Sequence, residues 1–194
     1  MDIGTISIAL GFAAGATQLA GYWVYNKECS EKISTGSWSI WAFAGLLDLA
    51  SYFVFTGDWV KNILPAVCAA AAFGTFCYAY VRKRLSWPDK VDRTFMGVDV
   101  VITVLWYFTS AVVANLLYQV STVLSFLPMY RGQLSGREVE KPRPWIIWTL
   151  AYILFTASVS LRLERWEELA YPLSHVAVHM VTALIAIAKQ RSVR

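Results

Sequence analysis

The chain has 194 residues, of which 57% are apolar and 15% are charged, with a formal net charge of +4. Soluble domains carry about 25% charged residues, and here the mean hydropathy is +0.49, so composition excludes a soluble globular domain as the bulk of the chain. The charges cluster between apolar runs, which indicates an all-α integral membrane protein. No interleaved basic and aromatic surface suggests that the chain binds nucleic acid.

Three apolar runs fill the first part of the chain, and we expect a membrane-spanning helix over each of residues 3–25, 38–55 and 60–81. Their lengths approach or exceed what a hydrocarbon core of about 30 Å requires at about 1.5 Å per residue. The first run is rich in glycine, which permits close packing between helices in lipid.

The second part of the chain begins with residues 94–130, which contain a single charge, Asp99. This stretch is too long for one span and long enough for two, so we expect a helix over residues 91–107 and another that begins near residue 110. Two further apolar runs, residues 145–161 and 169–188, complete a predicted set of seven transmembrane helices.

An internal repeat organises these helices. At an offset of 107 residues, the 75 gap-free pairs from Leu10/Leu117 to Arg84/Arg191 contain fifteen identities. Among them are three tryptophan pairs and a proline pair: Trp38/Trp145, Trp41/Trp148, Trp59/Trp166 and Pro65/Pro172. Such repeats define the architecture. We therefore expect a first three-helix repeat over residues 1–87, a linker helix within residues 88–109 and a second three-helix repeat over residues 110–194, with the linker making the repeats parallel.

Basic residues test this topology independently. Seven spans place fourteen of the 17 Lys and Arg residues on one side and only Lys61, Arg162 and Arg165 on the other. Because positive loops stay in the cytoplasm, we expect an outside N-terminus and a cytoplasmic C-terminus, in a plasma membrane or a bacterial inner membrane.

The layout, the topology and the helix end Leu124-Ser-Phe-Leu-Pro128 with its basic loop resemble the SWEET and SemiSWEET sugar transporters, and with them the PQ-loop and PnuC-type proteins. The resemblance covers nearly the whole chain and implies transport by alternating access. The chain departs from it at Met129, where the family pattern has Gln, and at Gly21, where the first repeat lacks the family's hinge proline. Pro128 is the gating proline that the resemblance implies for the second repeat.

The resemblance also implies a pocket. Its two binding-asparagine positions fall on Cys68 and His175, and its pocket tryptophan falls near Phe155, whose repeat mate is Asp48. Asp48 is informative by itself, because an intramembrane charge is costly and usually faces a cavity or a partner. It is a candidate ligand for a cation or for hydroxyls, a proton carrier, or a structural hydrogen-bonding group.

Other candidates carry more than one interpretation. His175 and His179 share a helix face, and they suit pocket donors, structural hydrogen bonds or, less well, a metal or haem site. Trp41 and Trp148 offer stacking faces or belong to an interfacial belt, and we place Trp38 and Trp145 in that belt. The polar residues expected to join helices or to line the path are Gln18, Asn115 and Gln119.

Minor features complete the predictions. Pro65 and Pro172 are expected to kink their helices, and Asp99 to be a structural or lipid-interface charge. Cys29, Cys68 and Cys77 lack metal-ligand spacing, and the latter two lie in apolar runs, which indicates buried thiols.

We therefore expect a transporter, not an enzyme, without cofactor or metal, that moves a small polar solute, first a sugar, by facilitated diffusion. The alternatives are PnuC-like uptake of an aromatic vitamin, and a receptor for cargo or lipid that transports nothing. Proton coupling through Asp48 or His175 stays open. A ceramidase-like hydrolase would need a third histidine, which the sequence lacks. The expected partners are the solute and membrane lipids, and a monomer or a homo-oligomer fits the size.

Overall fold

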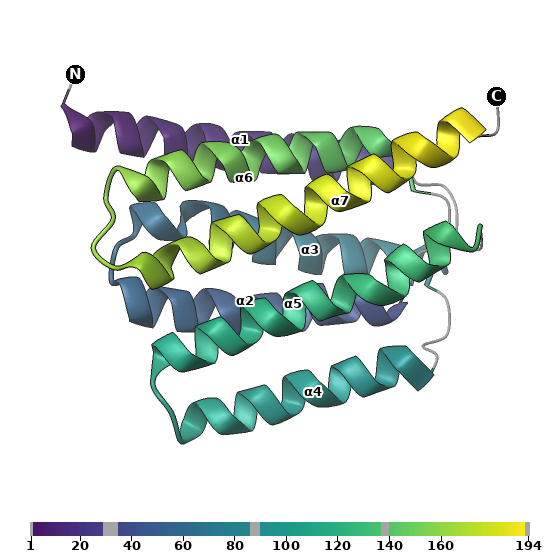
Figure 1. Ribbon diagram of the computed structural model, residues 1–194, viewed down its shortest axis with the longest axis horizontal. Coiled ribbons are helices and arrows are strands. Elements are labelled where there is room, and N and C mark those ends of the chain that lie inside the picture. The colour runs from purple at the N-terminus through teal and green to yellow at the C-terminus, as the bar shows by residue number, and fades with distance from the viewer. Residues whose placement is uncertain (1, 29–34, 86–89, 137–139, 193–194) are drawn as a thin grey trace.

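The computed structural model describes residues 2–28, 35–85, 90–136 and 140–192 and is almost entirely helical. Within them lie seven α-helices and two short 3-10 helices, arranged side by side along a common direction (Figure 1). In chain order they are α1 (Ile3–Glu28), α2 (Thr35–Thr56), η1 (Val60–Asn62), α3 (Ile63–Val81), α4 (Lys90–Tyr107), α5 (Ala111–Leu134), α6 (Pro142–Ser160), η2 (Trp166–Leu169) and α7 (Ala170–Ser192). The predicted all-α class is confirmed.

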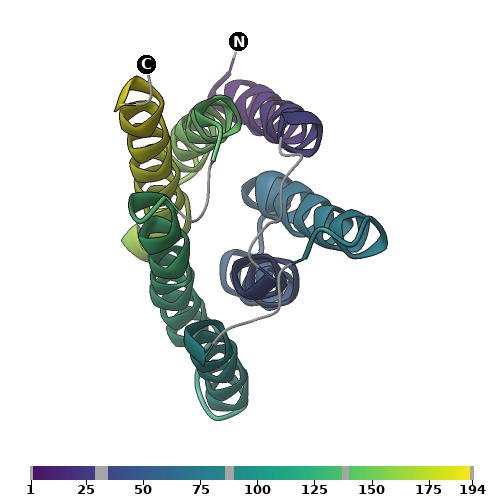
Figure 2. The ribbon, with the colours of Figure 1, turned by 90° about the vertical axis from the view of Figure 1, so that its right-hand side faces the viewer.

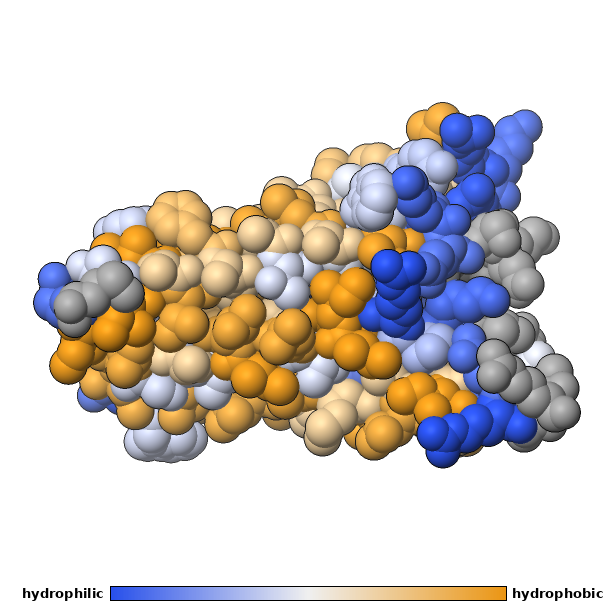
Figure 3. Space-filling model, turned by 90° about the horizontal axis from the view of Figure 1, so that it is seen from above, coloured by the Kyte–Doolittle hydropathy of each residue, from blue (hydrophilic) through white to orange (hydrophobic). Residues whose placement is uncertain are grey.

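Five segments are long and apolar enough to cross a membrane, in agreement with an integral membrane protein. They are Ile3–Glu28, Ser37–Thr56, Val60–Val81, Ala111–Leu134 and Trp166–Arg191. The perimeter is apolar as well: Phe12, Val54 and Phe108 are 58%, 67% and 75% exposed, and apolar residues cover much of the face in Figure 3. A soluble monomer rarely exposes so large an apolar surface, whereas lipid contact requires one.

Six of the helices form a closed ring, which Figure 2 shows from one end. Around the ring, each helix contacts the next in the order α1, α3, α2, α5, α7, α6 and back to α1, and α4 packs outside the ring against α2 and α5. The helix α3 thus lies between α1 and α2, as α7 lies between α5 and α6. Gly11 and Gly15 allow α1 to approach α3 closely, because a Cβ added at either glycine would lie 3.2 Å or 3.4 Å, respectively, from the Ile63 side chain.

Hydrophilic residues gather at one end of the molecule (Figure 3), the end at which α1, α3, α5 and α7 finish (Figure 1). This end carries, for example, Arg82, Arg84 and Lys189, whereas Lys61 and Arg162 lie at the opposite end. The structure therefore separates basic residues along the helix direction in the way that the sequence predicts.

Pro65, Pro128 and Pro172 lie within helices of the ring. Pro65 and Pro172 are the third residues of α3 and α7, each after a 3-10 turn. A proline in the first turn of an α-helix removes no intrahelical hydrogen bond, and both residues lie within the apolar segments Val60–Val81 and Trp166–Arg191; the predicted kinks stay predictions. Pro128, predicted to close a helix, lies inside α5, which continues to Leu134. The side chain of Asp99 lies outside the described residues.

Candidate functional site

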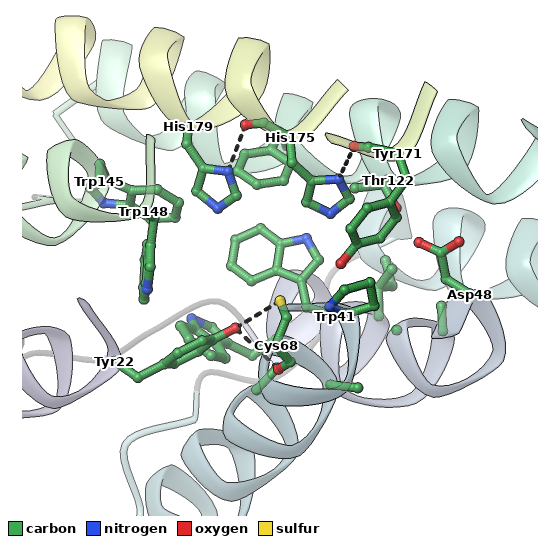
Figure 4. A pocket seen from close by; sticks show the side chains of 18 residues that line it. Tyr22, Trp41, Asp48, Cys68, Thr122, Trp145, Trp148, Tyr171, His175 and His179 are labelled. Atoms are coloured by element: carbon green, nitrogen blue, oxygen red, sulfur yellow. Dashed lines mark hydrogen bonds between the residues drawn. The ribbon is translucent and has the colours of Figure 1, made fainter. Parts of the chain in front are cut away.

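A cavity of about 50 Å³ lies inside the ring and is lined by all six of its helices (Figure 4). One water molecule needs about 10–15 Å³ of such space, so the cavity has room for several waters or for a small polar group. Its polar and aromatic lining residues are Tyr22, Trp38, Trp41, Asp48, Cys68, Thr122, Phe126, Trp145, Trp148, Tyr171, His175 and His179.

The cavity brings together six of the eleven predicted site residues. They are Trp41, Asp48, Cys68, Trp148, His175 and His179. Phe155 does not line the cavity, because it is fully buried in a separate cluster with Tyr52 and Tyr152. Gln18, Asn115, Gln119 and Pro128 also lie outside the lining, although the first three hold lining residues in place.

Four tryptophans surround the cavity, and their N–H groups are engaged by the protein. The indole of Trp41 on α2 donates to Ser125 Oγ on α5 (2.9 Å), and the indole of Trp148 on α6 donates to the Gln18 carbonyl on α1 (3.2 Å). Each pair thus joins the two halves, and the two pairs correspond at the 107-residue offset. Their indole faces, not their N–H groups, are left for a ligand.

Trp38 and Trp145 are not belt residues, contrary to the sequence-based expectation, since only 2% and 1% of their surfaces are exposed. Trp38 donates to the Tyr25 hydroxyl at 3.2 Å, and Trp145 donates to Glu140 Oε2 at 3.0 Å. An apolar ring at a helix start suits either lipid headgroups or the interior, and the sequence does not separate these environments. Trp59 and Trp166, by contrast, are 56% and 71% exposed.

Asp48 is held by two amides from α5. Its Oδ1 accepts from Asn115 Nδ2 at 2.7 Å and from Gln119 Nε2 at 2.8 Å. The opposite end of the Gln119 amide accepts from Ser174 Oγ on α7 at 2.9 Å. The predicted helix-joining role of Asn115 and Gln119 is therefore confirmed, and these bonds fix the carboxylate at the cavity wall.

In each of the two histidines, the ring nitrogen Nδ1 hydrogen-bonds to a backbone carbonyl, which leaves Nε2 as the nitrogen available to a ligand. His175 Nδ1 lies 2.9 Å from the Tyr171 carbonyl, and His179 Nδ1 lies 2.7 Å from the His175 carbonyl. A carbonyl only accepts, so each Nδ1 carries the hydrogen and each neutral imidazole keeps an acceptor at Nε2. Both rings stack on Tyr152, with ring centroids 4.6 Å and 5.1 Å apart.

A metal site receives no support from this geometry. Within the described residues, no group of three or more His, Cys, Asp or Glu side chains is placed to hold an ion. Both histidines line the cavity, and each ring hydrogen-bonds to the backbone carbonyl one turn earlier.

Cys68 is a half-buried free thiol among hydroxyl groups. Its Sγ lies 3.3 Å from the Tyr22 hydroxyl and accepts from Tyr152 Oη at 3.2 Å. Cys77 is exposed, so its predicted burial is wrong; it faces the apolar perimeter. Cys29 lies outside the described residues.

Sequence reasoning missed several lining residues, among them Tyr22, Thr122, Phe126 and Tyr171. One of them carried a signal, because Tyr171, His175 and His179 are spaced by four residues and so share one helix face. Because His175 and His179 share a helix face, the residue one turn earlier on that face, Tyr171, is also predicted to line the cavity. The other three are ordinary apolar or small polar residues of a span, and nothing in their spacing separates cavity from lipid.

Searches against protein-family models, curated proteins and solved structures found no match to this chain.

Proposed function

We propose that this protein is a seven-span membrane transporter, a facilitator in which two parallel three-helix bundles expose a central site alternately to each side. The bundles are residues 1–87 and 110–194, and residues 88–109 link them. The observation that carries the proposal is the cavity, which is lined by helices of both bundles. A polar cavity at a repeat interface is where transporters of this design bind solutes.

Contacts between the halves support a two-fold relation. Trp41 donates to Ser125, and its repeat counterpart Trp148 donates to Gln18, which is the repeat counterpart of Ser125. The same contact is therefore made twice, once in each direction between the halves. Lys61 and Glu168, 107 residues apart, bond to each other at 2.8 Å. A residue near a two-fold axis meets its own counterpart, and this pair therefore supports an axis through the helix starts of α3 and α7.

Charge supports the orientation of the transporter. Basic residues such as Arg82, Arg84 and Lys189 lie where α3 and α7 end, and the positive-inside rule assigns this end to the cytoplasm. The proposal therefore has the N-terminus outside and the Lys61–Glu168 pair near the outer surface.

The solute in this proposal is small and polar. The resemblance to SWEET proteins implies a sugar, and indole faces stack on sugars and on flat heterocycles alike. A second candidate, an aromatic vitamin, is favoured by the combination of Asp48 with four tryptophans around one cavity. A receptor that binds without transport is distinguished from both by the absence of flux.

The test starts with a thermal-shift screen of purified protein against sugars, thiamine, riboflavin and nicotinamide riboside. Any hit is then followed by uptake into proteoliposomes. Asp48→Asn and His175→Ala should abolish binding and uptake, whereas Asp2→Asn, which changes an exposed carboxylate and keeps a side chain that can cap α1, should leave both intact. A hit that survives both cavity substitutions would refute the site, and saturable binding without uptake would refute transport.

A further inference from the structure

The cavity lining offers a ligand few hydrogen-bond donors. All four indole N–H groups around the cavity donate to protein atoms, at 2.9–3.2 Å. The lining, as far as the structure describes it, contains no Lys, Arg, Asn or Gln side chain. No N–H group of a lining side chain is therefore left over for a bound solute, apart from a histidine that gains a second proton.

The same lining offers acceptors. The Nδ1–H groups of His175 and His179 are used by backbone carbonyls, so the available ring nitrogen of each neutral imidazole is the Nε2 lone pair. Asp48 adds a carboxylate, which can only accept when it is ionised. The lining also has the hydroxyl groups of Tyr22, Thr122 and Tyr171. Each can donate or accept, so they do not alter the excess of acceptors over N–H donors.

Aromatic faces complete the environment. Trp41, Trp148 and Phe126 line the cavity together with the other two indoles and two tyrosines. An aromatic ring attracts a cation through the negative potential of its face, with a larger effect where water is excluded. The aromatic faces and the Asp48 carboxylate thus both favour a positively charged ligand and disfavour an anion.

We propose that the solute is a small organic cation whose charged group carries N–H donors, such as a primary ammonium or a protonated nitrogen heterocycle. The positive group contacts Asp48 and the indole faces, and its N–H groups donate to Nε2 of His175 and His179. This inference rests on the proposed function for its context, since it names the substrate class of the same cavity. A bare metal ion does not fit, because the described residues provide no cluster of three ligating side chains.

Matched probes test the charge and the donors separately. Benzylammonium carries both, benzyltrimethylammonium carries charge without N–H, and benzyl alcohol and benzoate provide the neutral and anionic controls. Binding is measured by calorimetry on protein in nanodiscs, with empty nanodiscs as the blank. We expect benzylammonium to bind at least about tenfold more tightly than benzyl alcohol, because a hydrogen bond to a charged group contributes about 1.5–3 kcal/mol. Benzoate should not bind.

Two variants assign the effect to the cavity. Asp48→Asn should weaken both cations by about tenfold or more, because it removes the negative charge that attracts the positive group of each, and about 1.4 kcal/mol of lost attraction is tenfold in affinity. His175→Phe keeps a ring against Tyr152 and removes an acceptor, so it should weaken benzylammonium and leave benzyltrimethylammonium nearly unchanged. The Asp2→Asn protein, changed at an exposed carboxylate at the start of α1, serves as the control. If Asp48→Asn does not fold, the His175→Phe comparison and the wild-type selectivity still decide.

Equal or tighter binding of benzyl alcohol, or saturable binding of neither cation, would overturn the cation inference. So would a His175→Phe protein that loses affinity for both cations equally. None of these results bears on flux, and uptake of a neutral sugar would leave the transporter proposal intact. Conversely, selective cation binding without uptake of any bound solute would support the inference and contradict transport.

Discussion

Lys61 and Glu168 form a buried ion pair across the two halves of the molecule. Lys61 Nζ lies 2.8 Å from Glu168 Oε2, and their side chains are 0% and 2% exposed. The Tyr52 hydroxyl donates to the Glu168 backbone carbonyl at 2.9 Å. The pair joins η1 to η2, where α3 and α7 begin, and it lies at the end of the molecule opposite the basic loops.

Removing one member of this pair should destabilise the protein strongly. Lys61→Met leaves the Glu168 carboxylate buried without its cation, and such a change costs about 3–5 kcal/mol. The double variant Lys61→Met/Glu168→Met should recover most of that loss, because neither charge remains buried. Thermal unfolding in detergent measures both. Additive losses in the double variant would show that the two side chains are not energetically coupled.

Substituting Gly21 should disturb the cavity wall. A Cβ added at Gly21 would lie 2.4 Å from Cδ1 and Nε1 of Trp148, so Gly21→Ala must displace the indole that bonds to the Gln18 carbonyl. We expect a loss of about 1–3 kcal/mol, as for other overpacked cores, and a weaker affinity for any cavity ligand. Gly74→Ala, where nothing lies within 4 Å, is the matched control, and equal effects of both changes would contradict this packing.

The sequence predicted the helices and their polar residues better than the orientation of their apolar residues. Asp48 and the histidine stripe lie at the cavity because a polar group in lipid must be satisfied inside the protein. Trp38, Trp145 and Cys77 were assigned to the wrong surroundings, since lipid and protein interior are both apolar and no hydropathy pattern separates them. The Gly21 position shows a contact that only the folded structure reveals, namely the indole of Trp148 against the α1 backbone.

The amide of Gln119 should be necessary for the geometry of Asp48. Gln119→Leu removes one of the two described amide donors to Oδ1 and also the acceptor for Ser174 Oγ. Because a hydrogen bond to a charged group contributes about 1.5–3 kcal/mol, we expect a stability loss of that order and weaker ligand binding. Gln190→Leu, at the exposed end of α7, should change neither; a Gln119→Leu protein that behaves like it would contradict the network.

Acid should weaken one loop contact outside the membrane spans. Burial raises the pKa of Asp58, but hydrogen bonds from Arg162 and from the Val60 backbone N–H outweigh it and leave the pKa below its ordinary value of 3.8. Asp58 Oδ2 accepts from Arg162 Nε at 2.6 Å. A lowered folded-state pKa adds stability above pH 3.8 that is lost as the pH falls through the folded-state pKa.

Asp58→Asn should therefore reduce the pH dependence of unfolding in that acidic range, measured as the melting temperature in detergent at a series of pH values. The effect should be modest, because the Arg162 side chain is 30% exposed and water partly screens the pair. An unchanged acid slope in the Asp58→Asn protein would show that this carboxylate does not contribute to it.

The thiol of Cys68 provides the most direct test of alternating access, because it lines the cavity between the two three-helix bundles. In protein with Cys29→Ser and Cys77→Ser, reconstituted in one orientation, a membrane-impermeant thiol reagent is added to either side in turn. The proposal predicts that Cys68 reacts from both sides and that a cavity ligand slows both reactions. Reaction from only one side, or from neither, would contradict a path between the bundles.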